Sequence, residues 1–350
     1  MLLALSLLVA AAAGYSVTVS NVSTTPVLAH QTGTSPGFTA VYNPSWVTPA
    51  AASPIPSGLL VRSQHCPNAT VGACSQAVCG PSYITFSPLV GVLGTSEPKF
   101  GGLTNASVVF GPGNGTFDNL GTEDPRLVLH HSEGLYYMMY TSYGQVSPTT
   151  RSVLLSLATT RDPTTPHGWT RHGAVFPSIQ GSKSAAMLVS DAPGRPHHLL
   201  WGDTSIRIAT SGNLTSWPDP GPVLLSPRKG MFDSQLVEAG PLPLSLSDGN
   251  YLFLFNSAND SLAYHPSWAV LNGSDPSQVL HRADVPLLSP TTAWERGSPP
   301  WLCVTANVVF LEAVVELRRD TFQVFYGGAD TVIGSAIVSV DVHSYAKQHT

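Results

Sequence analysis

Short runs of apolar and aromatic residues recur along the chain, and each run leads into a turn rich in small residues. Runs of this length, bounded by turn residues, are typical of buried β-strands. The first residues of the five clearest runs lie 76, 63, 53 and 71 positions apart, which indicates an internal repeat. These runs occupy residues 59–62, 135–140, 198–203, 251–255 and 322–327.

Several of these runs are followed by a second strand pattern that contains a buried-type alanine. This second pattern is found at residues 154–159, 206–210 and 335–338. The first two examples lead into similar polar loops that end in Trp169 and Trp217. No segment combines the apolar spacing of an amphipathic helix with helix caps, so the pattern favours strands throughout.

Five units of about 65 residues, each with room for four short strands, predict an all-β fold: a single-domain, five-bladed β-propeller. A blade cannot bury both of its faces alone, so blades stack radially and cover one another. A β-sandwich does not require five similar units, and a β-helix has a much shorter repeat. In a propeller the inner strands converge on one axis. We therefore expect polar residues at their ends to meet there, although they are far apart in sequence.

Charged residues are sparse. The 350 residues include 16 Lys and Arg and 21 Asp and Glu, and the formal net charge is −5. A general nucleic-acid binder needs clustered cations, which this composition excludes. The hydrophobic content of 43% excludes charge-driven disorder, and 31 Gly with 30 Pro indicate a turn-rich chain rather than a helical bundle.

The apolar stretch at residues 2–13 is too short to span a bilayer, which takes about 20 residues. It suits the hydrophobic region of a secretory signal peptide, because Ala11, Ala12 and Ala13 supply small residues for cleavage. We expect a signal peptide over 1–14, an N-terminal extension over 15–40 and the propeller over 41–345, with no membrane span. The alternative is that residues 2–13 form a buried strand.

Seven Asn-x-Ser/Thr sequons also favour a secreted protein or one in the lumen of the secretory pathway. N-glycans would help a weakly charged surface to stay soluble. The sequons begin at Asn21, Asn68, Asn105, Asn114, Asn213, Asn259 and Asn272.

The chain has four cysteines, and three of them, Cys66, Cys74 and Cys79, lie close together, whereas Cys303 stands alone. In an oxidising compartment we expect one or two disulfides, and the pairing stays open. Zinc is the alternative use of these thiols. The chain has no Cys-x-x-Cys pair and no histidine at a suitable spacing, so we expect no metal and no other cofactor.

The sharpest local motif is Gly-Thr-Glu-Asp-Pro-Arg at residues 121–126. Pro125 favours an extended backbone at Asp124, and neighbouring side chains of an extended segment point to opposite faces. We therefore expect that Glu123 and Asp124 do not enter the same pocket. Taken alone, the motif also fits a turn that Asp124 caps.

Two further acids lie in apolar surroundings: Glu238, between Val237 and Ala239, and Glu295, directly after Trp294. A buried carboxylate without a partner costs several kcal/mol, so each needs a partner or a chemical task. Glycoside hydrolysis is a reaction that uses two carboxyl groups, one to protonate the leaving oxygen and one to attack or to deprotonate water. The chain contains no His-Glu-x-x-His motif, EF-hand loop or Walker motif.

The chain resembles glycoside hydrolase family 130, the β-mannoside phosphorylases and β-mannosidases with a five-bladed propeller. The resemblance runs, with gaps, from about residue 42 to residue 340. It is carried by ordered motifs at fitting intervals, including GTEDPR at 121–126 and VEAGPLPL at 237–244. The other motifs lie at 199–217, 268–290 and 307–336.

The resemblance implies that Asp124 is the acid that protonates the glycosidic oxygen, in some family members through a sugar hydroxyl. It also implies a set of substrate-binding residues around the mannosyl group that is released. Three of these contact the mannosyl group and two lie in motifs near it: Asn43, Arg62 and Asp330, with Lys183 and Asp203.

Phosphorylases of the family line the phosphate site with basic side chains, whereas the hydrolytic members carry glutamates there, and Glu238 and Glu295 match those positions. A carboxylate at this place repels phosphate and can deprotonate water. The resemblance thus implies a hydrolase that cleaves β-mannosidic linkages, β-1,2 linkages among them, with inversion; the N-terminal stretch and the sequons indicate that it is secreted. Asp124 or one glutamate is the acid, and the other glutamate is the base.

Other interpretations stay open. The chain could be a phosphorylase, a sugar-binding propeller without catalysis, or a five-bladed enzyme acting on arabinans or fructans. In the sugar-binding interpretation, Trp201, Trp268 and Trp294 stack on sugars, although tryptophans of this kind more often pack between blades. Departures from the family pattern motivate these alternatives, among them a cysteine-containing insertion at 65–80.

Overall fold

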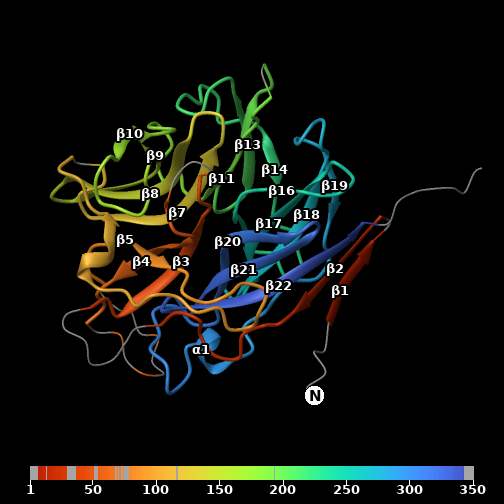
Figure 1. The fold of residues 1–350 in the computed structure, drawn as a ribbon, viewed down its shortest axis with the longest axis horizontal. Coiled ribbons are helices and arrows are strands. Elements are labelled where there is room, and N and C mark those ends of the chain that lie inside the picture. Colours follow the sequence, from red (N-terminus) through yellow and green to blue (C-terminus); the bar gives the residue numbers. More distant parts are fainter. Residues whose placement is uncertain are drawn as a thin grey trace, which may run out of the picture.

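The computed structural model describes residues 7–12, 14–29, 37–50, 54–67, 69, 71, 74, 79–115, 117–192 and 194–342. Within these residues five antiparallel sheets are arranged around a common centre, as Figure 1 shows. The only regular helices described are a short 3₁₀ turn, Asn105–Ser107, and one α-helical turn, α1 (Ala293–Arg296). The predicted all-β, five-bladed propeller is confirmed.

Each of the first three blades is a four-stranded meander. Blade 1 consists of β3 (Ala40–Val47), β4 (Gly58–Gln64), β5 (Tyr83–Pro88) and β6 (Val108–Phe110). Blade 2 consists of β7 (Gly121–His130), β8 (Leu135–Ser147), β9 (Thr150–Thr160) and β10 (Thr170–Ala174). Blade 3 consists of β11 (Ala185–Leu188), β12 (His197–Trp201), β13 (Ile206–Ser211) and β14 (Val223–Leu225).

In blade 4, two short inner strands pair with the same neighbour. These are β15 (Leu236–Ala239) and β16 (Leu244–Ser245), beside β17 (Tyr251–Ala258), which is followed by β18 (Tyr264–Leu271) and β19 (Val279–Arg282). Blade 5 consists of β20 (Val309–Arg318), β21 (Thr321–Gly328) and β22 (Val332–Val342). The five repeated runs of the sequence fall on β4, β8, β12, β17 and β21, each the strand next to the inner position of its blade.

The N-terminal segment closes the ring. The outer strands of blade 5 are β2 (Tyr15–Ser20), which pairs antiparallel with β22, and β1 (Leu7–Ala12), which pairs with β2. Pairing the first and last parts of the chain in one sheet holds the two ends of the ring together. Residues 1–6 and 13 lie outside the described residues, and the signal peptide over 1–14 stays a prediction. The closing strand β2 begins after that segment.

Large side chains fill the spaces between blades. Trp46 of blade 1 stacks on Phe325 of blade 5, with ring centroids 5.8 Å apart. Trp201, Trp268 and Trp294 are all at most 4% exposed. The idea that these three tryptophans stack on sugars is therefore wrong, because their rings are taken up by packing between and around blades. Burying side chains of this size contributes about 1.5–3 kcal/mol each.

The inner strands carry bulges where they approach the axis. The pairing register shifts between Tyr42 and Pro44 in β3, and between Leu311 and Ala313 in β20. A third shift lies in β7, between Glu123 and Arg126. A bulge turns an extra side chain out of the regular alternation. The bulged segments contain the polar residues Asn43, Asp124 and Glu312.

Two disulfides link the described cysteines, Cys66 to Cys79 and Cys74 to Cys303. The second joins the β4–β5 connection of blade 1 to the segment before β20 of blade 5, so it closes the ring a second time, covalently. Gly297 lies against this bond with φ +68°, and a Cβ there would lie 2.2 Å from the Cys303 sulfur. The disulfides fit an extracellular or secretory location.

Within the described residues, no helix has the length and apolar character that crossing a membrane requires.

The two disulfides close loops of very different length, 229 and 13 residues apart in sequence. In the chain-entropy account, a longer closed loop stabilises more, so we expect Cys74→Ser with Cys303→Ser to lower the free energy of unfolding by about 2.5 kcal/mol more than Cys66→Ser with Cys79→Ser. Urea unfolding of both double variants measures the difference. Equal losses of unfolding free energy would show that the disulfide between blades 1 and 5 does not stabilise the ring by closing the longer loop.

Candidate active site

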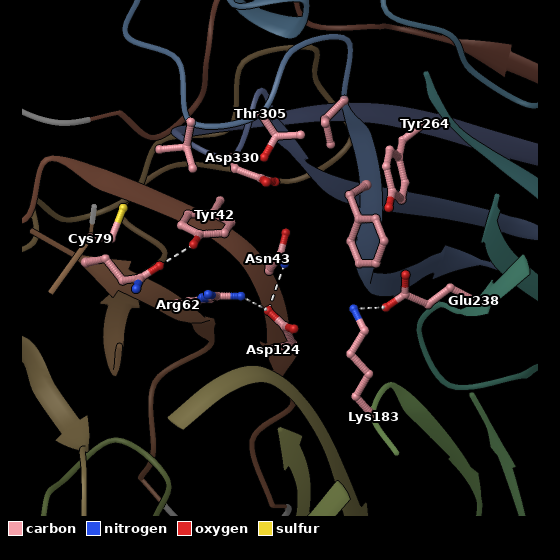
Figure 2. A pocket seen from close by; sticks show the side chains of 14 residues that line it. Tyr42, Asn43, Arg62, Cys79, Asp124, Lys183, Glu238, Tyr264, Thr305 and Asp330 are labelled. Carbon is pink, nitrogen blue, oxygen red and sulfur yellow. Dashed lines mark hydrogen bonds and ion pairs between the residues drawn. The ribbon is translucent and has the colours of Figure 1, made fainter. Parts of the chain in front are cut away.

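A cavity of about 370 Å³ opens on the axis where the inner strands meet, a volume at the lower end of the range of small-molecule sites. All five blades contribute to it through residues in or beside β3, β7, β11, β15 and β20. Figure 2 shows the side chains around the open space. Six of the eight residues predicted from the sequence line it: Asn43, Arg62, Asp124, Lys183, Glu238 and Asp330.

Asp124 is held by two donors from blade 1. The Asn43 side-chain amide donates to Asp124 Oδ1 at 2.8 Å, and Arg62 Nη1 donates to the same oxygen at 2.9 Å. The second oxygen, Oδ2, accepts no hydrogen bond from the described residues. The carboxylate is therefore fixed through one oxygen, and the other is available to a ligand.

The backbone at Asp124 is left-handed, with φ +50°, and Asn43 has φ +48°. The extended conformation expected at Asp124 is wrong, because the bulge in β7 overrides the effect of Pro125. Non-glycine residues at positive φ are uncommon, and they concentrate at functional sites. Asp330 and Ser184, also beside the cavity, have φ +54° and +53°.

Glu123 does not line the cavity, in agreement with the expectation that the two adjacent acids diverge. Its Oε1 accepts from Arg62 Nη2 at 2.8 Å and from the Ser82 hydroxyl at 2.7 Å. Glu123 thus holds the guanidinium from behind, and Arg62 bridges both acids of the motif. A bidentate arrangement of this kind restrains the direction of an arginine.

Lys183 and Glu238 form an ion pair on the opposite side of the cavity. Lys183 Nζ lies 3.1 Å from Glu238 Oε1, which also accepts from the Ser184 hydroxyl. Asp203 Oδ2 lies 3.9 Å from Lys183 Nζ, so Asp203 neighbours the cavity without lining it. Figure 2 shows the ammonium group facing the space between Glu238 and Asp124.

The two carboxylates have different electrostatic environments. Burial opposes ionisation of Asp124, but the charges of Arg62 and Lys183 hold its pKa well below the usual range. Burial raises the pKa of Glu238, although Lys183 and Ser184 oppose this shift. Asp124 is therefore ionised at neutral pH, and Glu238 takes up a proton first as the pH falls.

The far wall of the cavity is polar and aromatic. Burial raises the pKa of Asp330, and a hydrogen bond from Thr305 and the charge of Arg62 oppose the shift. Tyr42 donates to the Gln64 side chain, and Tyr264 closes the side next to Glu238. Sequence reasoning missed the wall residues Tyr42, Gln64, Tyr264 and Thr305. Only Tyr42 and Gln64, which flank Asn43 and Arg62 in the same strands, carried a usable signal.

Glu295 does not line the cavity, and the role of catalytic acid or base that the sequence predicted for it is wrong. Its Oε2 accepts from the backbone N–H groups of Thr291 and Thr292, both at 2.8 Å, and the Tyr326 hydroxyl donates to Oε1 at 3.0 Å. With Thr292 it forms the capping box of α1. Glu295 is 2% exposed, so both oxygens serve the fold.

Both cations that line the cavity are paired with carboxylates: Arg62 with Glu123 and Asp124, and Lys183 with Glu238. The lining acids, Asp124, Glu238 and Asp330, outnumber these two cations. Among the residues that the structure describes, no group of three or more His, Cys, Asp or Glu is placed to hold a metal ion. The arrangement is suited to proton transfer around a neutral, hydroxyl-rich ligand.

The family model and a known relative that match this chain both concern mannoside phosphorylases. Residues 103–343 match the glycoside hydrolase family 130 model, described as β-1,4-mannooligosaccharide phosphorylase. A 1,2-β-oligomannan phosphorylase from Thermoanaerobacter sp. (strain X514) is 34% identical over 63% of this chain and 69% of its own length.

Solved structures share the fold. A β-1,2-mannobiose phosphorylase from Listeria innocua in complex with β-1,2-mannobiose superposes with a TM-score of 0.68 at 20% identity, covering 90% of this chain and 94% of that one. A second structure is described as showing that the family of mannoside phosphorylases contains glycoside hydrolases that target β-1,2-mannosidic linkages in Candida mannan. It superposes with a TM-score of 0.67 at 23% identity, covering 89% and 93% of the two chains. The family match spans well over half of the chain, and the chain therefore belongs to glycoside hydrolase family 130.

Proposed function

We propose that this protein cleaves β-mannosides by hydrolysis and releases a terminal mannosyl unit. One observation carries the proposal: Asp124 and Glu238, from the inner strands of two different blades, line the same cavity with Lys183 between their charges. Two carboxyl groups facing one space are what glycosidic cleavage needs. Membership of family 130 supports a β-mannosidic bond as the target.

The proposed linkage is β-1,2. The oligomannan phosphorylase relative and both solved structures are described with β-1,2-linked substrates. The family description itself names β-1,4-mannooligosaccharides, so the linkage comes from the individual relatives and not from the family. The polar wall around Asp330 and Thr305 supports a ligand rich in hydroxyl groups.

Glu238 is the proposed base. Burial raises its pKa and so makes the ionised form a stronger base toward water, and its contacts with Lys183 and Ser184 favour that ionised form. A base that acts through a water molecule produces inversion and needs carboxyl groups about 6.5–9.5 Å apart. We therefore propose inversion at the anomeric carbon.

Asp124 is the proposed acid, acting on the leaving oxygen through a sugar hydroxyl or directly. Burial opposes its ionisation, but Arg62 and Lys183 lower its pKa, so the carboxylate is ionised at neutral pH before a substrate binds. We propose that it takes up a proton from solvent as the substrate enters, because a sugar bound at Oδ2 excludes water from the carboxylate and so raises its pKa, while Asn43 and Arg62 keep Oδ1. Asn43, Arg62 and Asp330 are proposed to hold the mannosyl group.

Phosphorolysis is the second candidate. The comparisons favour it over hydrolysis, because the family description names a phosphorylase and the oligomannan relative is one. The geometry favours water. Phosphate needs unpaired cations, whereas Arg62 and Lys183 are already paired and Glu238 adds negative charge beside Lys183. We keep hydrolysis as the proposal because a site built for phosphate would have to displace these pairs.

Substitution of each carboxylate tests its proposed catalytic role. With β-1,2-mannobiose as substrate, we expect Asp124→Asn and Glu238→Gln each to lower the rate of mannose release by about 10²–10⁴-fold, the usual contribution of an acid or base. Glu295→Gln is the matched control, since Glu295 is equally buried but faces away from the cavity, and it should retain the wild-type rate within a few-fold. Wild-type turnover by Asp124→Asn, or a loss in Glu295→Gln as large as in Glu238→Gln, would refute the assignment.

The pH profile tests the base. An ionised base is required once Asp124 has its proton in the substrate complex, so kcat should fall as the pH decreases through the raised pKa of Glu238, above the ordinary glutamate value of about 4.3. Lys183→Met removes a charge that lowers this pKa, so the acid limb should move to higher pH. An acid limb that stays in place in Lys183→Met would contradict the role of Glu238.

The acceptor is tested by phosphate. We expect the purified protein to release free mannose from β-1,2-mannobiose in phosphate-free buffer, and added inorganic phosphate should neither raise the rate nor yield mannose 1-phosphate. Both products are separated by ion-exchange chromatography. Activity that appears only with phosphate would establish phosphorolysis instead.

A further inference from the structure

A buried arginine lies on the axis beside the cavity, and the proposed mechanism does not use it. Arg126 is 4% exposed and contacts three inner strands, β7, β15 and β20. We propose that Arg126, neutralised by Glu312, is a positioning residue that sets the placement of Asp124 and Glu238 relative to each other. This inference rests on the proposed function of the two carboxylates.

The first contact holds Asp124. Arg126 Nη1 donates to the backbone carbonyl of Asp124 at 2.9 Å. That carbonyl belongs to the bulged residue with φ +50°, a strained conformation that a non-glycine residue keeps only where its surroundings enforce it. The hydrogen bond fixes the peptide plane after Asp124 and so the direction of its side chain.

The second contact reaches the opposite carboxylate. Arg126 Nη2 donates to the backbone carbonyl of Ala239 at 3.0 Å, and Ala239 directly follows Glu238 in β15. One rigid guanidinium thus bonds the strand of the proposed acid and the strand of the proposed base. A planar fork with fixed donor directions transmits such a spacing, which a single ammonium group cannot do.

The third contact supplies the charge balance. Arg126 Nη2 lies 2.7 Å from Glu312 Oε1, and Glu312 is 1% exposed in the bulge of β20. Neither oxygen of Glu312 has a hydrogen bond within the described part of the chain, so Arg126 is the charge that compensates it. Removing one partner of such a buried pair leaves the other charge unbalanced next to both catalytic groups.

Other charges also face this pair. Burial raises the pKa of Glu312, and the charge of Arg126 is the main effect that opposes this shift. Asp124 and Glu238 raise this pKa further, and Arg62 lowers it. Lys183 acts on both Asp124 and Glu238 from the cavity side. Arg126 and Glu312 thus act on Asp124 and Glu238 from the protein interior. Arg62 and Lys183 act from the cavity.

Two conservative variants separate position from charge. Arg126→Lys keeps the charge but cannot bond two carbonyls in fixed directions, so kcat should fall on the order of 10–100-fold, with KM within about three-fold and the acid limb of the pH profile unmoved. Glu312→Gln keeps the shape but leaves Arg126 unbalanced. The extra positive charge stabilises ionised Glu238, so the acid limb should move to lower pH.

Hydrogen exchange provides a readout that does not need turnover. The amides of residues 122–124, 126 and 237–240 should exchange faster in Arg126→Lys, while those of 251–255 should stay protected as in the wild type. Unfolding midpoints in urea identify any variant that loses activity only because it unfolds. A loss of kcat that follows the loss of stability, or unchanged exchange at both segments, overturns the positioning role.

The outcomes also separate this inference from the proposed function. If the wild type cleaves no β-mannoside and the two segments still loosen in Arg126→Lys, the positioning role stands and the proposed function fails. If the wild type is active while Arg126→Lys retains both its kcat and its exchange pattern, the proposed function stands and the positioning role fails. If Arg126→Lys does not fold, an unmoved acid limb in Glu312→Gln overturns the inference.

Discussion

Negative charge concentrated on the propeller axis is the constraint on which the site depends. Convergence of the inner strands brings Asp124, Glu238 and Glu312 together in a region with little water, where like charges repel and each loses hydration. Cations offset this repulsion: Arg126 pairs with Glu312 on the interior side, and Lys183 pairs with Glu238 on the cavity side. Which carboxylate can hold a proton follows from this arrangement and not from either acid alone.

Closure of the ring supports the same region. Blade 5 takes its outer strands from the N-terminal part of the chain, and the Cys74–Cys303 bond joins the segment before β20 to blade 1. Cys79 lines the cavity itself, as do Val304 and Thr305, which follow Cys303. Cys79, which belongs to the cysteine-containing segment that departs from the family pattern, therefore forms part of the wall around the site.

Much of this could be predicted from the sequence, for physical reasons that also explain the misses. The repeated apolar runs predicted the propeller because each run marks the second strand of a blade. That strand is buried on both faces, so its sequence is mainly apolar. Asp124 was found by its motif, but its left-handed backbone was not, because a bulge depends on the partner strand. Glu295 was misplaced although Thr292-Ala-Trp-Glu is a readable capping box. The disulfide pairing and the wall residue Tyr264 depend on segments far apart in sequence.

The most direct test of the account is the structure of the Glu238→Gln variant with β-1,2-mannobiose bound. The account predicts the terminal mannosyl group in the axial cavity, with its glycosidic oxygen or an adjacent hydroxyl at Asp124 Oδ2. A water molecule should lie between its anomeric carbon and residue 238. A disaccharide bound on another face of the propeller, or with its anomeric carbon turned away from both side chains, would contradict it.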